Sequence, residues 1–520
     1  MDNHEGKDLT LARKNSLVLM IFTLISRILG IVKARVIATV FGLTGTADII
    51  NFTFNIPNNF RKLFAEGAFN SAFIPEFTRL IVEKRGEKEL LRNLLGFQFV
   101  IMLPLIILTF IFRRPIIVFL SDFSGDQSLI LAGNLLAYFS IYLALITFYS
   151  LFAGVLQSHQ TFLVASIAPL IFSVCVIASV SYLSRYYGPY SMVIGVIIGG
   201  AGQVLFTVAK VRSLDYDIRI SFNFRSPDVR RVLRRWVPVT FSSLIAIVTQ
   251  QAAYYFATTL QEGSVTAFSN AIIVYQAPYG IFYAAIATAF FPSLSIAFNQ
   301  NNRQRLHELS DEGIAYLLSF LIPSAILLIV WRSESCAVLF SGGNYSVEDA
   351  VKTGEVLLYF AIGMPFIAVY GFLQRLSYSA DRFRMTVYIA FVVSICDILL
   401  TIFLLGRTND VSSIALANTI ALSAGLVIYT LVLSRSHIYS LLNISLLKKL
   451  AKIISVNIPL AAISYLMKMT VGNSWWINGS SFSSFLILAG IYLTSALMTL
   501  GVYRIFKIDI GIFFKNKERE

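Results

Sequence analysis

The fold class is decided by stretches such as residues 93–112, which read NLLGFQFVIMLPLIILTFIF. Twenty residues without a charge are enough to cross the hydrocarbon core of a bilayer as an α-helix. Lipid offers no hydrogen-bond partners, so the backbone inside it must form helices or a closed barrel. The apolar runs of this chain are about 20 residues or longer rather than alternating strands of about ten, which favours helices. We therefore expect an all-α membrane protein.

Composition gives the same class. Of the 520 residues, 57% are hydrophobic and 13% are charged, against about 25% charged in soluble domains. The apolar runs predict about 14 transmembrane helices. They are expected at residues 16–41, 47–78, 93–112, 127–156, 162–184, 189–209, 236–258, 265–297, 312–331, 353–374, 385–405, 412–433, 453–467 and 482–503.

The 42 lysines and arginines are distributed unevenly around these spans. With the N-terminus in the cytoplasm, 30 of them fall on the cytoplasmic side, 7 on the outer side and 5 inside the first two spans. The positive-inside rule then predicts that both termini are cytoplasmic. The net charge of +14 is explained by this topology and by attraction to anionic membrane lipids. We expect no nucleic-acid partner.

An internal repeat divides the chain. Residues 135–163 align without gaps to residues 356–384 at an offset of 221, with eight identical pairs that include Tyr138 with Tyr359 and Phe139 with Phe360. The same offset places Pro57 on Pro278. We expect two pseudo-symmetric six-helix lobes followed by two C-terminal helices. Six spans in each lobe make the repeats parallel, and transporters built in this way bind their substrate between the lobes.

The expected organisation has six parts. They are a cytoplasmic N-terminus (1–15), an N-lobe (16–212), a basic cytoplasmic linker (213–235), a C-lobe (236–433), two further spans (434–506) and a cytoplasmic tail (507–520).

The first two spans contain many polar side chains, which are costly in a membrane and normally face a cavity. Asn51, Asn55, Asn58, Lys62 and Glu66 follow helical steps of three or four and can form one stripe. Cations on these helices suit a phosphate or carboxylate, because Arg can bind such groups with two hydrogen bonds and Lys acts as a point charge. Pairing within the helix, as between Lys62 and Glu66, is the alternative. The candidate substrate-binding residues are Arg27, Lys33, Asp48, Asn55, Asn58, Arg61, Lys62 and Glu66, and Asp48 and Glu66 are also candidates for structural partners or gate residues.

Other candidates concern motion and coupling. Proline inside a helix removes a hydrogen bond and bends it, so Gly30, Pro57, Pro278 and Gly280 are candidate hinge or gate residues, with a role in shaping a cavity as the alternative. Asp397 beside Asn418 could bind a sodium ion or a proton, or could be satisfied by neighbouring hydroxyls. The chain has no P-loop. We expect no cofactor, with an ion gradient, the membrane potential or the substrate's own gradient as the driving force.

The first two spans also carry a long motif. It comprises Ser26–Gly30, Phe41–Gly42, Ala47–Asp48, Pro57–Asn58, Arg61–Phe69 and Ala72–Pro75, with weaker agreement at Gly263–Val265, Phe291–Ser295 and Ile414–Ala417. This motif closely resembles that of the MurJ/MviN family of lipid II flippases, and with fourteen spans the resemblance covers essentially the whole chain. That family belongs to the multidrug/oligosaccharidyl-lipid/polysaccharide exporter superfamily.

The resemblance implies a function. Such proteins move undecaprenyl-pyrophosphate-linked peptidoglycan precursor from the inner to the outer leaflet of the bacterial inner membrane. By position, the family's functional cations fall on Arg27, Lys33 and Arg61, and its acidic residue at the start of the second span falls on Asp48. The expected partners are lipid II, membrane lipids and cell-wall synthesis proteins.

The sequence departs from the family pattern at three positions. Ala34 replaces a common acidic residue, Ile273 stands where an arginine is usual, and Ala253 occupies the polar position expected at a sodium site. Pyrophosphate binding is therefore expected to depend more on the first two spans, and sodium binding through Asp397 alone is not favoured.

The sequence thus predicts a lipid II flippase that works by alternating access and is not an enzyme. Same-fold alternatives are a flippase for another polyprenyl-linked glycan and a drug/ion antiporter, although the basic stripe disfavours a cation cargo. A non-transporting scaffold for cell-wall assembly is the alternative from another class. A membrane glycosyltransferase would need catalytic carboxylates near an outer loop, and the sequence shows no such cluster.

Overall fold

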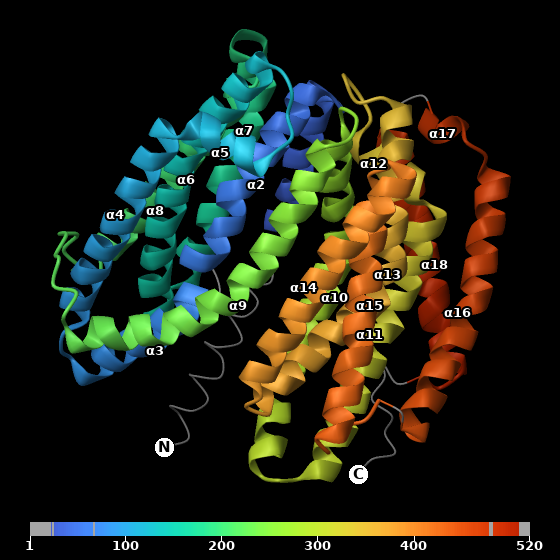
Figure 1. The fold of residues 1–520 in the computed structure, drawn as a ribbon. Helices are drawn as coiled ribbons and strands as arrows, with labels where there is room; N and C mark the ends of the chain where they lie inside the picture. Colours follow the sequence, from blue (N-terminus) through green and yellow to red (C-terminus); the bar gives the residue numbers. More distant parts are fainter. Residues whose placement is uncertain (1–21, 23–24, 66–67, 442, 478–481, 509–520) are drawn as a thin grey trace. The chain divides into compact units, whose positions relative to one another are not determined.

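A computed structural model of the chain describes residues 22, 25–65, 68–441, 443–477 and 482–508. Within these residues every regular element is a helix (Figure 1), so the all-α class is confirmed. Residues 25–41 form the first described helix. The others are α2 (Gly45–Phe64), α3 (Ala68–Glu83), α4 (Glu87–Ile111), α5 (Arg113–Leu120), α6 (Asp126–Ser158), α7 (Phe162–Tyr187), α8 (Tyr190–Arg212), α9 (Pro227–Thr258), α10 (Ser264–Asn299), α11 (Arg303–Val330), α12 (Arg332–Phe340), α13 (Val347–Ser379), α14 (Phe383–Thr408), α15 (Ser412–Arg435), α16 (Ile444–Val471), α17 (Ser474–Ile477) and α18 (Phe482–Ile505).

Twelve helices of the described residues are long and apolar enough to cross a membrane. Each overlaps one predicted span, and α6 matches 127–156 closely, although α9, α11 and α16 each begin nine residues earlier than predicted. The second predicted span, 47–78, lies on two helices, because α2 ends at Phe64 and α3 begins at Ala68. The first predicted span extends into residues that the structure does not describe. The short helices α5, α12 and α17 were not predicted, because four to nine residues give too little periodicity to recognise.

The predicted repeat is visible in the helix boundaries. Adding 221 to the bounds of α6 gives the bounds of α13, and the same operation on α7 gives α14. The neighbours also correspond: α6 packs on α4, α5 and α8, as α13 packs on α11, α12 and α15. The rings of Phe54 and Phe139 lie 5.4 Å apart, and their counterparts Tyr275 and Phe360 lie at the same distance. One difference is that α10 runs without a break where the first copy has both α2 and α3.

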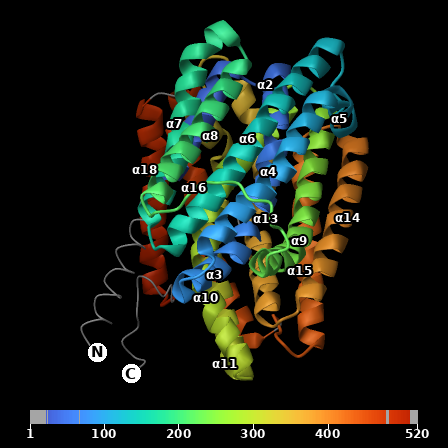
Figure 2. The same ribbon diagram turned by 90° about the vertical axis from the view of Figure 1, so that its left-hand side faces the viewer.

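The chain forms two compact units, Met1–Val265 and Thr266–Glu520. In the first, α4, α6, α7 and α8 lie side by side (Figure 2). Helix α9, which we had expected to open the C-lobe, packs on α2, α3 and α4 of the first unit. It begins at Pro227, inside the predicted linker 213–235, because Pro at the first turn suits a helix start. It changes direction along its length (Figure 1), and Pro238 lies within it. The predicted lobe boundaries stay a prediction.

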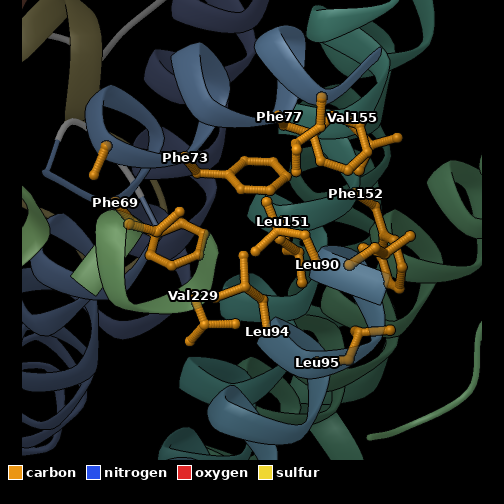
Figure 3. Packing of buried hydrophobic residues seen from close by; sticks show 14 of the residues in the cluster. Phe69, Phe73, Phe77, Leu90, Leu94, Leu95, Leu151, Phe152, Val155 and Val229 are labelled. Atoms are coloured by element: carbon orange, nitrogen blue, oxygen red, sulfur yellow. The ribbon is translucent and has the colours of Figure 1, made fainter. Parts of the chain in front are cut away.

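An apolar core of the first unit surrounds α3. Phe69, Phe73 and Phe77 repeat at intervals of four residues and therefore lie on one face of the helix. Adjacent rings are 5.8 Å and 5.0 Å apart. Figure 3 shows them packed against leucines of α4 and residues of α6, with Val229 of α9 nearby. This core holds α3 in the same unit as α2, the helix that carries the polar stripe.

In the second unit, α16 and α18 are the two helices beyond the repeat. They pack on α11 and α12. The carboxylate of Glu334, only 1% exposed, lies 2.8 Å from the ammonium of Lys468 on α16. Nearby, the indole of Trp331 donates to the hydroxyl of Ser464 at 2.9 Å. A buried charge requires a partner, so this ion pair specifies where α16 docks.

Candidate functional site in the first unit

Helix α2 has one apolar and one polar face. Ile49, Ile50, Phe52, Ile56 and Leu63 are buried in the first unit. The described members of the predicted stripe point the other way: Asn51, Asn55 and Asn58 are half-buried and Lys62 is exposed. The helix starts at Gly45 because the hydroxyl of Thr44 accepts a hydrogen bond from the backbone N–H of Ala47. The periodicity of the sequence thus placed four polar side chains on one accessible face.

Two asparagines of this face bond to their own helix. The amide of Asn51 donates to the carbonyl oxygen of Ala47 at 3.1 Å, and the amide of Asn55 donates to that of Asn51 at 2.8 Å. Their side chains are therefore held in place along the polar face. Fixed amides are suited to hydrogen-bonding a polar headgroup without further loss of side-chain entropy.

Lys33 approaches this face from the helix over residues 25–41. Its ammonium lies 5.2 Å from the ring centre of Phe172 and 6.0 Å from that of Phe54. The aromatic faces attract the cation, and Lys33 is close enough to Arg61 for the two positive charges to interact. The structure therefore brings together two of the three cations that the sequence singled out. Phe54 and Phe172 were missed, because an aromatic residue in an apolar run gives no signal of its own.

Lys62 lies beside α9. Its ammonium donates to the side-chain oxygen of Asn59 at 3.2 Å and to that of Gln250 at 2.9 Å. Both of these partners are neutral amides. Gln250 thereby joins the site from α9, although the predicted boundaries place this residue in the C-lobe (236–433).

Asp48 has a structural role at the start of α2. It is 4% exposed, and its carboxylate accepts a hydrogen bond of 2.7 Å from the backbone N–H of Gly263. The neighbouring Glu262 accepts from the backbone N–H of Gly45 at 3.2 Å. These two bonds join the start of α2 to the loop after α9. The arrangement favours the structural role for Asp48 over direct substrate contact.

Four further candidates belong to the first two predicted spans. Arg27 is half-buried and lies on the same helix as Lys33. Gly30 lies between them, and an added Cβ would meet no atom within 4 Å. Pro57 lies inside α2, which continues through it. Glu66 lies outside the described residues, so its predicted pairing and gate role stay predictions.

The second unit holds the remaining predicted residues. Pro278 lies inside the continuous helix α10, as does Gly280, so hinge motion there stays a prediction. The carboxylate of Asp397 on α14 accepts a hydrogen bond of 2.7 Å from the amide of Asn418 on α15. Among the described residues no group of three or more His, Cys, Asp or Glu is arranged to hold a metal ion. A cation beside Asp397 would therefore need further oxygens from amide, hydroxyl or backbone groups, and the predicted role of Asn418 stays a prediction.

Sequence reasoning missed one cation. Arg375 lies near the end of α13, just beyond the predicted span 353–374, and was counted only as a loop charge. It is half-buried, and its guanidinium lies over the ring of Tyr283 at 5.4 Å. The repeat could have drawn attention to it, because its counterpart in the first copy is Gly154.

The family comparison agrees with the resemblance seen in the motifs. The family model described as "Lipid II flippase MurJ" matches residues 37–487. A protein of Borreliella burgdorferi named "Probable lipid II flippase MurJ" is 34% identical over 504 residues, which cover 95% of this chain and 97% of that protein. A protein of the same name from Rickettsia prowazekii is 26% identical over 68% of this chain and 70% of its own length.

Solved structures share the fold. One described as "Lipid II flippase MurJ, inward closed conformation" superimposes with a TM-score of 0.78 at 23% identity, covering 94% of this chain and 100% of its own. A multidrug resistance MATE family transporter of the MOP superfamily, in an inward-facing conformation, gives a TM-score of 0.65 at 15% identity, covering 79% of this chain and 94% of its own. With a family match over most of its length, this multi-pass membrane protein belongs to the lipid II flippase MurJ family.

Proposed function

We propose that this chain moves lipid II, the undecaprenyl-pyrophosphate-linked peptidoglycan precursor, from the inner to the outer leaflet of the inner membrane by alternating access. The observation that carries the proposal is that two half-buried cations of the first unit, Lys33 and Arg61, come from different helices and are near enough for their charges to influence each other. Family membership supports the choice of substrate.

The chemistry of this face suits a pyrophosphate. Like charges placed close together in a membrane protein repel each other, and an anionic ligand removes that cost. Arg61 can form two parallel hydrogen bonds with phosphate oxygens, whereas Lys33 contributes a compact charge. The fixed amides of Asn51 and Asn55 are suited to the sugar hydroxyls. The polyprenyl tail, being apolar, gains nothing by leaving the lipid.

Transport without a covalent step is the second part of the proposal. Moving a lipid between leaflets breaks no bond, so binding groups and a change of conformation are sufficient. Parallel repeats are typical of transporters that alternate between two access states. The driving force is proposed to be an ion gradient, the membrane potential or consumption of the product on the outer side.

The proposal is tested by replacing the cations one at a time. The chain is depleted in its native cells, and the labelled lipid II exposed on the outer leaflet is measured after rescue with wild type, Arg27→Ala, Arg61→Ala or Arg85→Ala. Arg85 is the matched control, because it is an exposed arginine that pairs with Glu83 at 2.9 Å. We expect Arg61→Ala and Arg27→Ala to lower exposed lipid II at least tenfold, because each variant loses about 1.4 kcal/mol or more of binding free energy for the pyrophosphate. Arg85→Ala should behave as wild type.

Other outcomes separate the alternatives. If depletion leaves exposed lipid II unchanged, the substrate is wrong and another lipid-linked glycan becomes the favoured cargo. Full rescue by both Arg27→Ala and Arg61→Ala, at equal protein levels in the membrane, would contradict the cationic mechanism and favour a scaffold.

A further inference from the structure

A column of tyrosine rings lies along α10 in the second unit. Tyr275, Tyr279 and Tyr283 are four residues apart and therefore share one face of the helix. The ring centres of Tyr275 and Tyr279 are 5.2 Å apart, and those of Tyr279 and Tyr283 are 4.9 Å apart with planes only 11° from parallel. Tyr279 and Tyr283 are half-buried rather than enclosed. The column is not needed to fill a core, since part of it remains accessible.

Arg375 of α13 lies over the end of this column. Its guanidinium lies 5.4 Å from the ring centre of Tyr283 and donates a hydrogen bond of 3.2 Å to the hydroxyl of Thr288. Gly371 makes this approach possible, because a Cβ there would lie 2.6 Å from the Tyr283 hydroxyl oxygen. Among the described residues the contacts of Arg375 are all with neutral groups, and a guanidinium has five N–H donors. Its positive charge is therefore held in place without a carboxylate to balance it.

In the two copies of the repeat the corresponding cation comes from different helices. Tyr283 is the counterpart of Lys62, and Arg375 is the counterpart of Gly154. In the first unit a side chain at position 154 has no room, because its Cβ would lie 2.8 Å from the ring of Phe73. The counterpart of Phe73 is the smaller Leu294. Each unit thus has a cation at the same level of the repeat, from α2 in the first and from α13 in the second.

We propose that Arg375, together with Tyr279 and Tyr283, forms a second anion-binding site that takes anionic oxygens of the cargo's headgroup. The inference deepens the proposed function and rests on it. Two parts of such a headgroup carry this chemistry, the pyrophosphate and the carboxylates of the peptide. The guanidinium would bind either with paired hydrogen bonds, while the accessible tyrosine edges offer hydroxyls and flat apolar surface to the adjoining sugars. A chain that has Ile273 in place of the usual arginine would in this way still have a cation in its second unit.

The test measures binding by the purified full-length protein in nanodiscs. Three ligands are compared: lipid II, undecaprenyl pyrophosphate, and lipid II whose peptide carboxylates are amidated. The variants are Arg375→Gln, Arg375→Lys and Arg407→Gln. Arg407 is the matched control, because its guanidinium also lies over an aromatic ring, that of Phe403 at 4.3 Å, but on α14. Thermal unfolding of each variant shows whether it folds as wild type does.

We expect Arg375→Gln to weaken lipid II binding about tenfold, Arg375→Lys to weaken it less because the charge remains, and Arg407→Gln to leave it unchanged. A loss that extends to undecaprenyl pyrophosphate identifies the phosphates as the bound group. A loss confined to unmodified lipid II identifies the peptide carboxylates.

Three results would overturn the inference. If Arg375→Gln binds all three ligands as wild type does, the site is wrong while the proposed function stands. If Arg375→Gln weakens the binding of lipid II and of amidated lipid II but not that of undecaprenyl pyrophosphate, the group bound by Arg375 is not an anion. If wild type binds none of the three ligands, the proposed function fails and this inference fails with it.

Discussion

Several cationic side chains on the long helices of this protein lie against aromatic rings or neutral amides. Lys33 lies over the rings of Phe54 and Phe172, and Arg375 lies over that of Tyr283. A ring attracts a cation by roughly 0.5–2 kcal/mol but does not neutralise it. A carboxylate would hold the same side chain more firmly and would also cancel its charge. Aromatic support therefore keeps a cation in place and still available to an anionic ligand.

At the cytoplasmic end expected for α6, His159 illustrates the cost of burying a base. Its Nε2 lies 2.7 Å from the hydroxyl of Tyr216, and burial lowers the pKa of His159 below its ordinary value of 6.5, against the opposing effect of Glu87. The folded state therefore binds a proton at His159 less readily than the unfolded state does. The contribution of the neutral imidazole to the free energy of unfolding is complete above pH 6.5 and is lost as the pH falls from 6.5 through the folded pKa.

We therefore predict that His159→Gln, which keeps a hydrogen bond to Tyr216, makes stability less dependent on pH between 7.5 and 5.5. The effect is expected to be below about 2 °C in the unfolding midpoint, because the ring is partly exposed to solvent. Thermal unfolding of the detergent-solubilised protein measures it. An equally steep decline in the variant would show that His159 does not contribute to the pH dependence.

At the scale of elements, a network of charges fastens α3 to the start of α9. Glu76 on α3 is 2% exposed, and its carboxylate lies 2.6 Å from Arg79 and 2.9 Å from Arg231. Arg235 is more distant at 3.9 Å, and Asp228 bonds to Arg79 at 3.1 Å. One buried carboxylate thus balances arginines from two helices. Hydrogen bonds to Glu76 and Glu83 raise the pKa of Arg79, so its guanidinium stays charged at any physiological pH.

Replacing Glu76 by Gln should loosen the docking of α3 on α9. The arginines would then repel one another without the central charge, at a cost of about 3 kcal/mol, the low end for a broken buried pair because the arginines are partly exposed. Hydrogen–deuterium exchange should rise across residues 68–83, and the unfolding midpoint should fall. Glu83→Gln is the matched control on the same helix, since its carboxylate is accessible to water and its removal should change little. Unchanged exchange in Glu76→Gln would mean that the phenylalanine core alone holds α3.

At the scale of the whole molecule, four side-chain contacts among the described residues each join two loops that the predicted topology places on the same side. Lys88 pairs with Asp215 and Arg92 with Asp217, all on predicted cytoplasmic segments. The backbone N–H of Asp122 donates to Thr258 among the predicted outer loops. In the second unit Asp311 accepts a hydrogen bond from Tyr439, and both residues lie on predicted cytoplasmic segments. The alternation of sides is thus consistent in both units, whereas the absolute orientation rests on the positive-inside rule.

Orientation can be measured with single cysteines in a variant lacking Cys175, Cys336 and Cys396. A membrane-impermeant maleimide applied to intact spheroplasts should label Asn344→Cys and should not label His437→Cys until the membrane is permeabilised. This result is expected because 30 of the 42 basic residues would otherwise face outward. The reverse labelling pattern would invert the topology and contradict the cytoplasmic position of both termini.

The sequence by itself determined the class, most of the spans and the repeat. Apolar runs of about 20 residues have one stable conformation in lipid, so the ends of α6 and α14 came within two or three residues of the predicted spans. The stripe on α2 was also predictable, because helical periodicity requires only local order. The residues that α2 contributes to the candidate site could thus be predicted without a structure.

Only the tertiary structure decided which residues meet. The approach of Lys33 to Arg61, the packing of α9 on α2 and α3, and the position of Arg375 over Tyr283 all depend on contacts between segments distant in sequence. Asp48 has the same charge whether it binds a substrate or the backbone of Gly263, and only the fold distinguishes the two roles. The physical reason is that secondary structure in a membrane is fixed by each segment's own hydrogen bonds, whereas a binding site is fixed by packing between segments, which local sequence does not encode.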